Sequence, residues 1–118
     1  MKIEKGNKVL ITVAASGIGR STAMAMSALG CRLFLTDING RLLEEVAGMI
    51  SKNGGEVCRS RAMDVSKYEE VRAFAEEINK DFGPMDIVMN IAGIALFALV
   101  EDMTHNHWKK VIDINLWG

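Results

Sequence analysis

Cysteine is scarce in this chain, whose 118 residues include only Cys31 and Cys58. The two stand far apart, and neither belongs to a Cys-x-x-Cys pair or has a histidine at metal-ligand spacing. His105 and His107 are two positions apart, so a helix would point them in different directions. We therefore predict no metal site, and we expect both cysteines to be small, buried, apolar residues in strands.

A surplus of charge and a long apolar segment are also lacking. The net charge is −1 and 25% of the residues are charged, so no basic field is available to hold a nucleic-acid backbone or an acidic membrane surface. No segment approaches the roughly twenty apolar residues that a membrane span needs. We expect a cytoplasmic protein without nucleic-acid or membrane partners, whose ligand is small and neutral or is an anion held by backbone amides.

The order of apolar segments predicts the fold class. Short β-branched runs alternate with segments of helical periodicity, and no hairpin signal separates them. This alternation predicts a single α/β domain over residues 1–118, with a parallel sheet covered by helices on both faces. The expected strands are residues 9–13, 32–36, 57–63 and 85–91, and the last expected helix begins near Thr104.

A glycine-containing turn follows the first expected strand. Residues 14–19 read AASGIG, and Gly17 and Gly19 would let the backbone approach a pyrophosphate at the start of the next helix, where amides are unpaired. The same pattern fits a tight strand-to-helix turn that binds nothing. Two glycines alone leave both interpretations open.

Asp37 favours the ligand-binding interpretation. It follows the second expected strand, about twenty residues after the turn. A carboxylate at this place accepts hydrogen bonds from both hydroxyls of an adenosine ribose and repels a 2′-phosphate. The alternative role is a cap for the helix that begins near Asn39. Because the turn and the intervening strand are both present, we predict ribose binding.

These features belong to a longer set of motifs. Residues 12–19 read TVAASGIG, residues 90–93 read NIAG, Asp64 and Val65 follow the third strand, and Asn115 stands in DINLWG. Over its whole length the chain resembles the N-terminal half of a short-chain dehydrogenase/reductase of the ordinary, non-extended branch. The resemblance implies a Rossmann-type doubly wound parallel sheet, truncated, with strand order 3-2-1-4.

The resemblance also implies the roles of particular residues. Residues 16–19 would lie along the pyrophosphate, Asp37 would hold the adenosine ribose, and Asn115 would be the asparagine of the catalytic tetrad. Members that prefer NADP usually carry a basic residue near Ser16 or Ile38, and neither is basic, so NAD is expected rather than NADP. The implied cofactor-binding residues are Ser16, Gly17, Ile18, Gly19, Asp37, Asp64, Val65, Asn90, Ala92 and Gly93.

Two of these residues have structural alternatives. Asp64 could favour the N-terminus of the next helix through the helix dipole, where Ser66 and Glu69 have the spacing of a capping box. Asn90 could tie neighbouring strands together. The sequence leaves the roles of both open.

The chain departs from the family pattern in two places. Val13 replaces the first glycine of the turn, and its β-branched side chain disfavours any positive φ and would crowd the cofactor. The chain ends at Gly118, before the family's catalytic serine and Tyr-x-x-x-Lys pair. The only tyrosine is Tyr68, with Arg72 four positions later. We therefore expect weakened cofactor binding and no catalysis by this chain alone.

Three functions follow as hypotheses. The first is the nucleotide-binding half of an NAD-dependent oxidoreductase that transfers hydride between NAD(H) and an alcohol or ketone. The second is a non-catalytic module that binds a nucleotide or pairs with a partner, and the third is an inert truncation product. Because later strands would normally cover the fourth strand, we also expect self-association through that open edge or the last helix.

Overall fold

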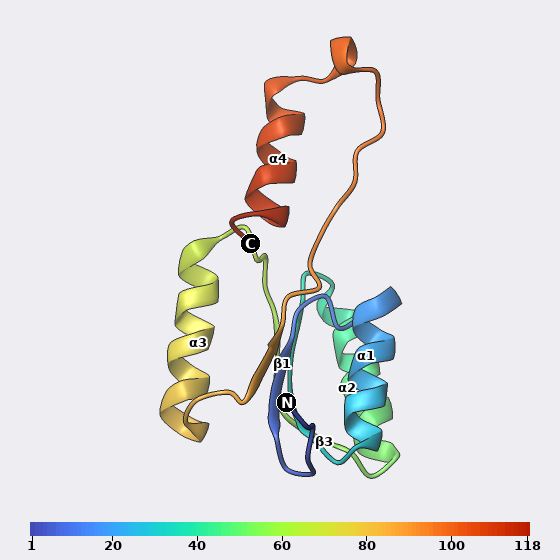
Figure 1. Ribbon diagram of the computed structural model, residues 1–118, viewed down its shortest axis with the longest axis vertical. Coiled ribbons are helices and arrows are strands. Elements are labelled where there is room, and N and C mark those ends of the chain that lie inside the picture. Colours follow the sequence, from blue (N-terminus) through green and yellow to red (C-terminus); the bar gives the residue numbers. More distant parts are fainter.

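The computed structural model describes residues 1–118 and contains one four-stranded sheet (Figure 1). All pairings are parallel and the strand order is β3-β2-β1-β4, which confirms the predicted fold class and strand order. Helices α1 and α2 cover one face and α3 covers the other. The strands are β1 (Lys8–Ile11), β2 (Arg32–Asp37), β3 (Glu56–Ala62) and β4 (Ile87–Met89). The helices are α1 (Gly17–Ala28), α2 (Gly40–Lys52), α3 (Tyr68–Phe82) and α4 (His105–Asn115), with a 3-10 turn η1 at Val100–Asp102.

Side chains of the central strands belong to two hydrophobic clusters, one on each face of the sheet. Leu33 and Leu35 of β2 point toward α1 and α2, whereas Phe34 between them points toward α3. Phe34 packs edge-on against Phe82, with ring centroids 5.0 Å apart, and beside the buried Phe74. A strand buried on both faces reads as a continuous apolar run, which is why the sequence places β2 correctly.

The second and third strands lie within one residue of the prediction at each end, whereas the first and fourth end two residues earlier than predicted. The apolar run at residues 9–13 was expected to be strand throughout, but β1 ends at Ile11, and Val13 adopts a left-handed conformation with φ 53°. The fourth strand was expected over residues 85–91 and covers only Ile87–Met89. Hydrophobicity marks which residues face the core, and it does not record where the backbone leaves the sheet to begin a turn.

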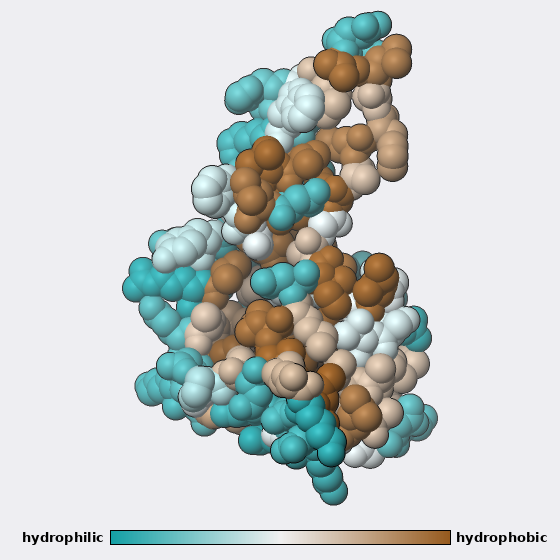
Figure 2. All heavy atoms as spheres, in the orientation of Figure 1, coloured by the Kyte–Doolittle hydropathy of each residue, from teal (hydrophilic) through white to brown (hydrophobic).

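Residues 94–118 extend away from the sheet, so that the long axis of the molecule is 50 Å against 31 Å and 27 Å for the others (Figure 1). This segment contains η1 and α4, and none of its residues is buried. Apolar side chains are exposed over it (Figure 2). The Phe97 side chain is 95% exposed. None of the four helices has the length and apolar character to cross a lipid bilayer.

Candidate functional site

A cavity of about 170 Å³ opens beyond the carboxyl ends of the parallel strands. In an open α/β sheet this is the edge where ligands bind, because the strand order reverses there and the following loops diverge. Five of the predicted cofactor-binding residues line the cavity. The complete lining is Val13, Asp37, Ile38, Met63, Asp64, Val65, Ala92, Gly93, Ile94 and Ile114.

The first turn of α1, next to Val13, is left without a side-chain cap. Its N-cap residue Ser16 makes no capping hydrogen bond, whereas Asn39 caps α2 and Thr104 caps α4. Gly17 has φ 52°, a conformation that glycine adopts without strain. The amides at the start of α1 are therefore available to an anion, and the helix dipole favours one there.

Gly19 allows α1 to pack directly against the end of β1. A Cβ built at this position would lie 1.8 Å from the carbonyl oxygen of Val13, closer than any real contact permits. Gly19 is thus required for the approach of helix and strand, and Gly17 for the turn. Both glycines therefore fit a tight strand-to-helix turn, and their predicted contact with a pyrophosphate stays a prediction.

Asp37 joins the turn to β2 from within the cavity. Its Oδ2 accepts a hydrogen bond from the Ala15 amide (3.0 Å), and its Oδ1 accepts one from the Asn39 amide (2.9 Å). The side chain that caps α2 is that of Asn39, which accepts from the Leu42 amide, so Asp37 is not the helix cap. A carboxylate offers about four acceptor positions, and two remain for hydroxyl donors in the cavity.

Asp64 is held by the residues that precede α3. Its Oδ1 accepts hydrogen bonds from the Ser66 hydroxyl (2.7 Å) and the Ser66 amide (2.9 Å), and these two bonds lower the pKa of the Asp64 carboxyl. The capping box expected at Ser66 and Glu69 is wrong. The N-cap residue of α3 is Lys67, and the Ser66 hydroxyl cannot cap the helix because it donates to Asp64. Glu70, and not Glu69, accepts a hydrogen bond from the Asp64 amide.

Thr12 is the site residue that the sequence did not single out. Its Oγ1 accepts hydrogen bonds from the amides of Ile91 (2.8 Å) and Ala92 (3.0 Å), and thereby fixes the loop after β4 against the end of β1. Asn90, the predicted alternative for tying strands together, is exposed and its side chain makes no hydrogen bond. A polar residue at the end of an apolar strand was the available signal, since a buried hydroxyl needs partners.

Asn115 anchors α4 to the same loop. Its Oδ1 accepts from the Ile94 amide and its Nδ2 donates to the Ile94 carbonyl oxygen, both at 2.8 Å. Ile114 beside it lines the cavity. The Asn115 side chain is thus used to hold one wall of the cavity, and its predicted catalytic role stays a prediction.

Comparisons with known proteins identify relatives of this chain. Residues 7–118 match the family model described as short chain dehydrogenase. This chain belongs to the short-chain dehydrogenase family. It is 35% identical to D-threitol dehydrogenase of Mycolicibacterium smegmatis over 96% of its own length and 43% of the other's.

Two solved structures of the short-chain dehydrogenase family superpose closely on the chain. A family member from Burkholderia phymatum in complex with NAD has a TM-score of 0.91 at 30% identity, over 99% of this chain and 41% of that one. A metagenomic short-chain oxidoreductase in complex with NADP also has a TM-score of 0.91, at 31% identity, over 98% of this chain and 52% of the other. The chain therefore spans about half the length of these relatives.

The predicted cofactor-binding residues of this short-chain dehydrogenase chain fall into three groups. Asp37, Asp64, Val65, Ala92 and Gly93 share the cavity, whereas residues 16–19 are outside its lining, at the start of α1. Asn90 lines a different cavity, between β4 and α3. Among the described residues no cluster of three or more His, Cys, Asp or Glu could hold a metal ion.

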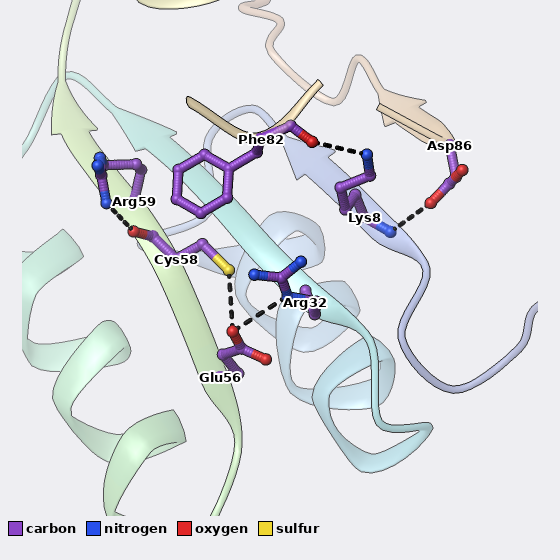
Figure 3. Close-up of polar contacts among 7 residues, drawn as sticks. All are labelled: Lys8, Arg32, Glu56, Cys58, Arg59, Phe82 and Asp86. Carbon is purple, nitrogen blue, oxygen red and sulfur yellow. Dashed lines mark hydrogen bonds and ion pairs between the residues drawn. The ribbon is translucent and has the colours of Figure 1, made fainter. Parts of the chain in front are cut away.

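The opposite, amino-terminal edge of the sheet carries a separate polar cluster (Figure 3). The Cys58 thiol donates to Glu56 Oε1 (3.3 Å), which also pairs with Arg32 Nε (3.1 Å). Burial, followed by the neighbouring Glu56 carboxylate, raises the pKa of the Cys58 thiol. The prediction for the cysteines was partly wrong, because Cys58 is half-buried and hydrogen-bonded and Cys31, although buried, precedes β2.

Proposed function

We propose that this chain is the nucleotide-binding part of an NAD-dependent oxidoreductase acting on an alcohol or carbonyl substrate, and that alone it binds the dinucleotide without turnover. The observation that carries the proposal is the cavity at the carboxyl edge of the sheet, which Asp37 and Asp64 line and where Asp37 is hydrogen-bonded to the turn that leads into the uncapped start of α1. We include a cytoplasmic location in the proposal.

The residues present fit a dinucleotide. The first-turn amides of α1 supply donors for a pyrophosphate, Asp37 supplies acceptors for the adenosine ribose, and Asp64 with Val65 would border the adenine. When bound, NAD would accept a hydride from an alcohol substrate, and its reduced form NADH would supply one to a carbonyl substrate. A 2′-phosphate next to the Asp37 carboxylate would be repelled, which supports NAD over NADP.

Val13 works against this fit. Its φ of 53° is unfavourable for a β-branched residue, and its side chain lines the cavity together with Asp37. A ligand that fills this cavity and contacts the Asp37 carboxylate would therefore also lie against Val13. We therefore propose that the affinity for NAD is lower than a glycine at this position would give.

The lack of turnover is inferred from the groups available for proton transfer. Tyr68 is the only tyrosine, and it begins α3, 72% exposed and outside the cavity lining. Arg72, four positions later, pairs with Glu69 and Glu76. Asn115, the one residue of the family's catalytic set matched here, is occupied with Ile94, and we propose for it a positioning role.

A second function is favoured by the exposed apolar surface of residues 94–118. A non-catalytic module that pairs with a partner would need such a surface, whereas an isolated nucleotide-binding domain would not. An inert truncation product would bind neither a nucleotide nor a partner. These alternatives are separated by binding and turnover measurements on the same material.

Calorimetric titration of the folded chain with NAD and NADP tests the proposal. We expect NAD to bind more tightly than NADP, and Val13→Gly to bind NAD about tenfold more tightly than the parent chain, or about 1.4 kcal/mol. NADH oxidation with a panel of ketones should remain at background. Flat NAD titrations for both proteins would refute nucleotide binding, equal affinities would refute the role of Val13, and measurable turnover would refute inactivity.

A further inference from the structure

Two Asn-Gly dipeptides lie at opposite ends of α2. Asn39 and Gly40 stand where the helix begins, and Asn53 and Gly54 follow where it ends. In such a dipeptide the backbone nitrogen of the glycine can attack the asparagine side chain, because glycine has no side chain to hinder the approach and leaves the backbone free to rotate. The sequence makes the two dipeptides equivalent in this respect, and the structure does not.

The first dipeptide is held in place by the start of α2. The Asn39 Oδ1 accepts a hydrogen bond from the Leu42 amide (3.1 Å), and the Asn39 amide donates to Asp37 Oδ1 (2.9 Å). Gly40 is already helical and packs against β3, since a Cβ built on it would lie 3.1 Å from the Ala62 Cβ. Attack of the Gly40 nitrogen on the Asn39 side chain would therefore require the cap to break and the first turn of α2 to unwind.

The second dipeptide lies at the exposed end of α2, where no contact fixes the asparagine side chain. Asn53 and Gly54 are both exposed, and the Asn53 side chain makes no hydrogen bond. A Cβ built on Gly54 would meet nothing within 4 Å. The Gly54 amide donates to the Ser51 carbonyl oxygen (3.1 Å), a bond of the last helical turn, and terminal turns open far more often than the interior of a helix. Opening of this turn frees the Gly54 nitrogen for attack.

We propose that Asn53 is a site of spontaneous deamidation in the folded chain and that the cap of α2 protects Asn39 from the same reaction. The Gly54 nitrogen loses its proton and forms a bond to the Asn53 Cγ, and the bond from Cγ to the side-chain nitrogen breaks, so that ammonia leaves with the proton. Water then opens the five-membered succinimide at either carbonyl group and gives aspartate or isoaspartate. A neutral amide becomes a carboxylate, and the net charge changes from −1 to −2.

Isoaspartate at position 53 would disturb a tightly packed junction. The main chain of isoaspartate passes through the side-chain methylene group, so the backbone before Gly54 becomes one carbon atom longer. Gly55 comes next, and a Cβ built on it would lie 2.1 Å from the Ser27 Oγ and 2.6 Å from the Ile50 Cγ2, which shows how closely both helices approach it. The new carboxylate would also lie at the negative end of the α2 dipole. Both effects should destabilise the packing of α1, α2 and the start of β3.

Peptide mass spectrometry of the aged protein tests both dipeptides in one sample. Trypsin places them in different peptides, residues 33–41 and 53–59. In mildly alkaline buffer the folded chain should form isoaspartate in the second peptide at least about tenfold faster than in the first, because the cap and first turn of α2 must open before Asn39 reacts. In concentrated urea the two peptides should react at similar rates, because both asparagines then precede a freely rotating glycine. Digestion in water enriched in oxygen-18 marks any deamidation that occurs during preparation.

The ratio of the two rates in the folded chain decides the outcome. Equal rates, a faster first peptide, or no product in the second peptide while the unfolded chain reacts would each overturn the proposal. The comparison needs no nucleotide, so its failure would leave the proposed binding of NAD unaffected, and failure of NAD to bind would leave this proposal unaffected.

Thermal unfolding of fresh and aged samples measures the consequence for the fold. The unfolding midpoint of the aged parent chain should fall by several degrees, whereas aged Asn53→Gln should keep its midpoint, because glutamine would have to form a six-membered ring and reacts far more slowly. Asn79→Gln is the matched control, at an exposed position of α3 that lysine follows, and it should age as the parent chain does. An equal loss of stability in aged Asn53→Gln would overturn Asn53 as the site.

Discussion

The segment from β1 to β4 and the segment after it differ in how far their side chains are buried. Every buried residue lies between Val9 and Ile87, whereas residues 94–118 contain none. Both segments are rich in apolar side chains, so composition does not separate them. The first segment packs its apolar faces against one another. The helix of the second segment is held by the two hydrogen bonds of Asn115 and by its last turn, where Ile114 lines the cavity next to Asp64 and Val65. Apolar character alone therefore does not indicate a self-contained core.

The largest effect should come from removing one phenylalanine ring from each segment. Phe74 is 1% exposed between α3 and the sheet, and Phe74→Ala should lower the free energy of unfolding by about 3–5 kcal/mol. Phe97→Ala should change it by less than about 0.5 kcal/mol, because that ring is already in water. Urea denaturation at low protein concentration measures both. Equal costs would mean that the second segment is packed as firmly as the first.

A glycine pair within the first segment sharpens the comparison. Gly19→Ala would drive a methyl group into the Val13 carbonyl and should cost about 3 kcal/mol. Gly48→Ala, at an exposed position inside α2 with open space around it, should instead stabilise the protein by about 0.5–1 kcal/mol. Thermal unfolding followed by circular dichroism compares the two. A neutral Gly19→Ala would contradict the close approach of α1 to β1.

The same comparison shows which features of the fold and of the candidate site could be predicted from the sequence alone. The alternation of strands and helices along the chain and the turn at Gly17 and Gly19 could be predicted from the residues, because periodicity and turn chemistry are local properties. The strand order 3-2-1-4 within the sheet was predicted from the family resemblance and not from periodicity. The hydrogen bonds that Thr12 accepts from the amides of Ile91 and Ala92 could not be predicted, because they join residues far apart in the chain. They depend on how β1 and β4 come side by side.

Two further features escaped prediction for the same reason. The pairing of Asn115 with Ile94 depends on the path of a loop that has no periodicity. The choice of Glu70 over Glu69 near Asp64 depends on how the chain enters α3. In each case the residue types were suggestive, and the partner was set by tertiary structure.

The anchor at Asn115 should control opening of the second segment without unfolding the first. Asn115→Ala removes both bonds to Ile94, and amide exchange across α4 should become roughly fivefold faster, or about 1 kcal/mol in local opening free energy. Exchange in β1 and β2 should be unchanged. Asn106→Ala is the control, because Asn106 is also on α4 and its side chain makes no hydrogen bond. Protection lost throughout the sheet would show that the two segments unfold together.

The smallest effect concerns the boundary between the sheet and α3, and it depends on pH. The Ser66 hydroxyl and amide lower the pKa of Asp64, so these bonds favour the folded state only while the carboxyl is ionised. Ser66→Ala should lower the free energy of unfolding by about 1 kcal/mol at neutral pH. A carboxyl with a lowered folded pKa contributes its full stability above its unfolded pKa, so the loss should stay constant down to about pH 4.

Below that pH the difference between the parent chain and Ser66→Ala should shrink, as the pH falls through the folded pKa of Asp64 and the acceptor becomes protonated. Urea denaturation from pH 7 to pH 3 measures this, with Ser51→Ala at an exposed position near the end of α2 as the pH-independent control. A difference that persists unchanged at pH 3 would mean that the Ser66 hydroxyl stabilises α3 through some group other than the Asp64 carboxylate, and that the cavity wall next to Val65 is held by packing alone.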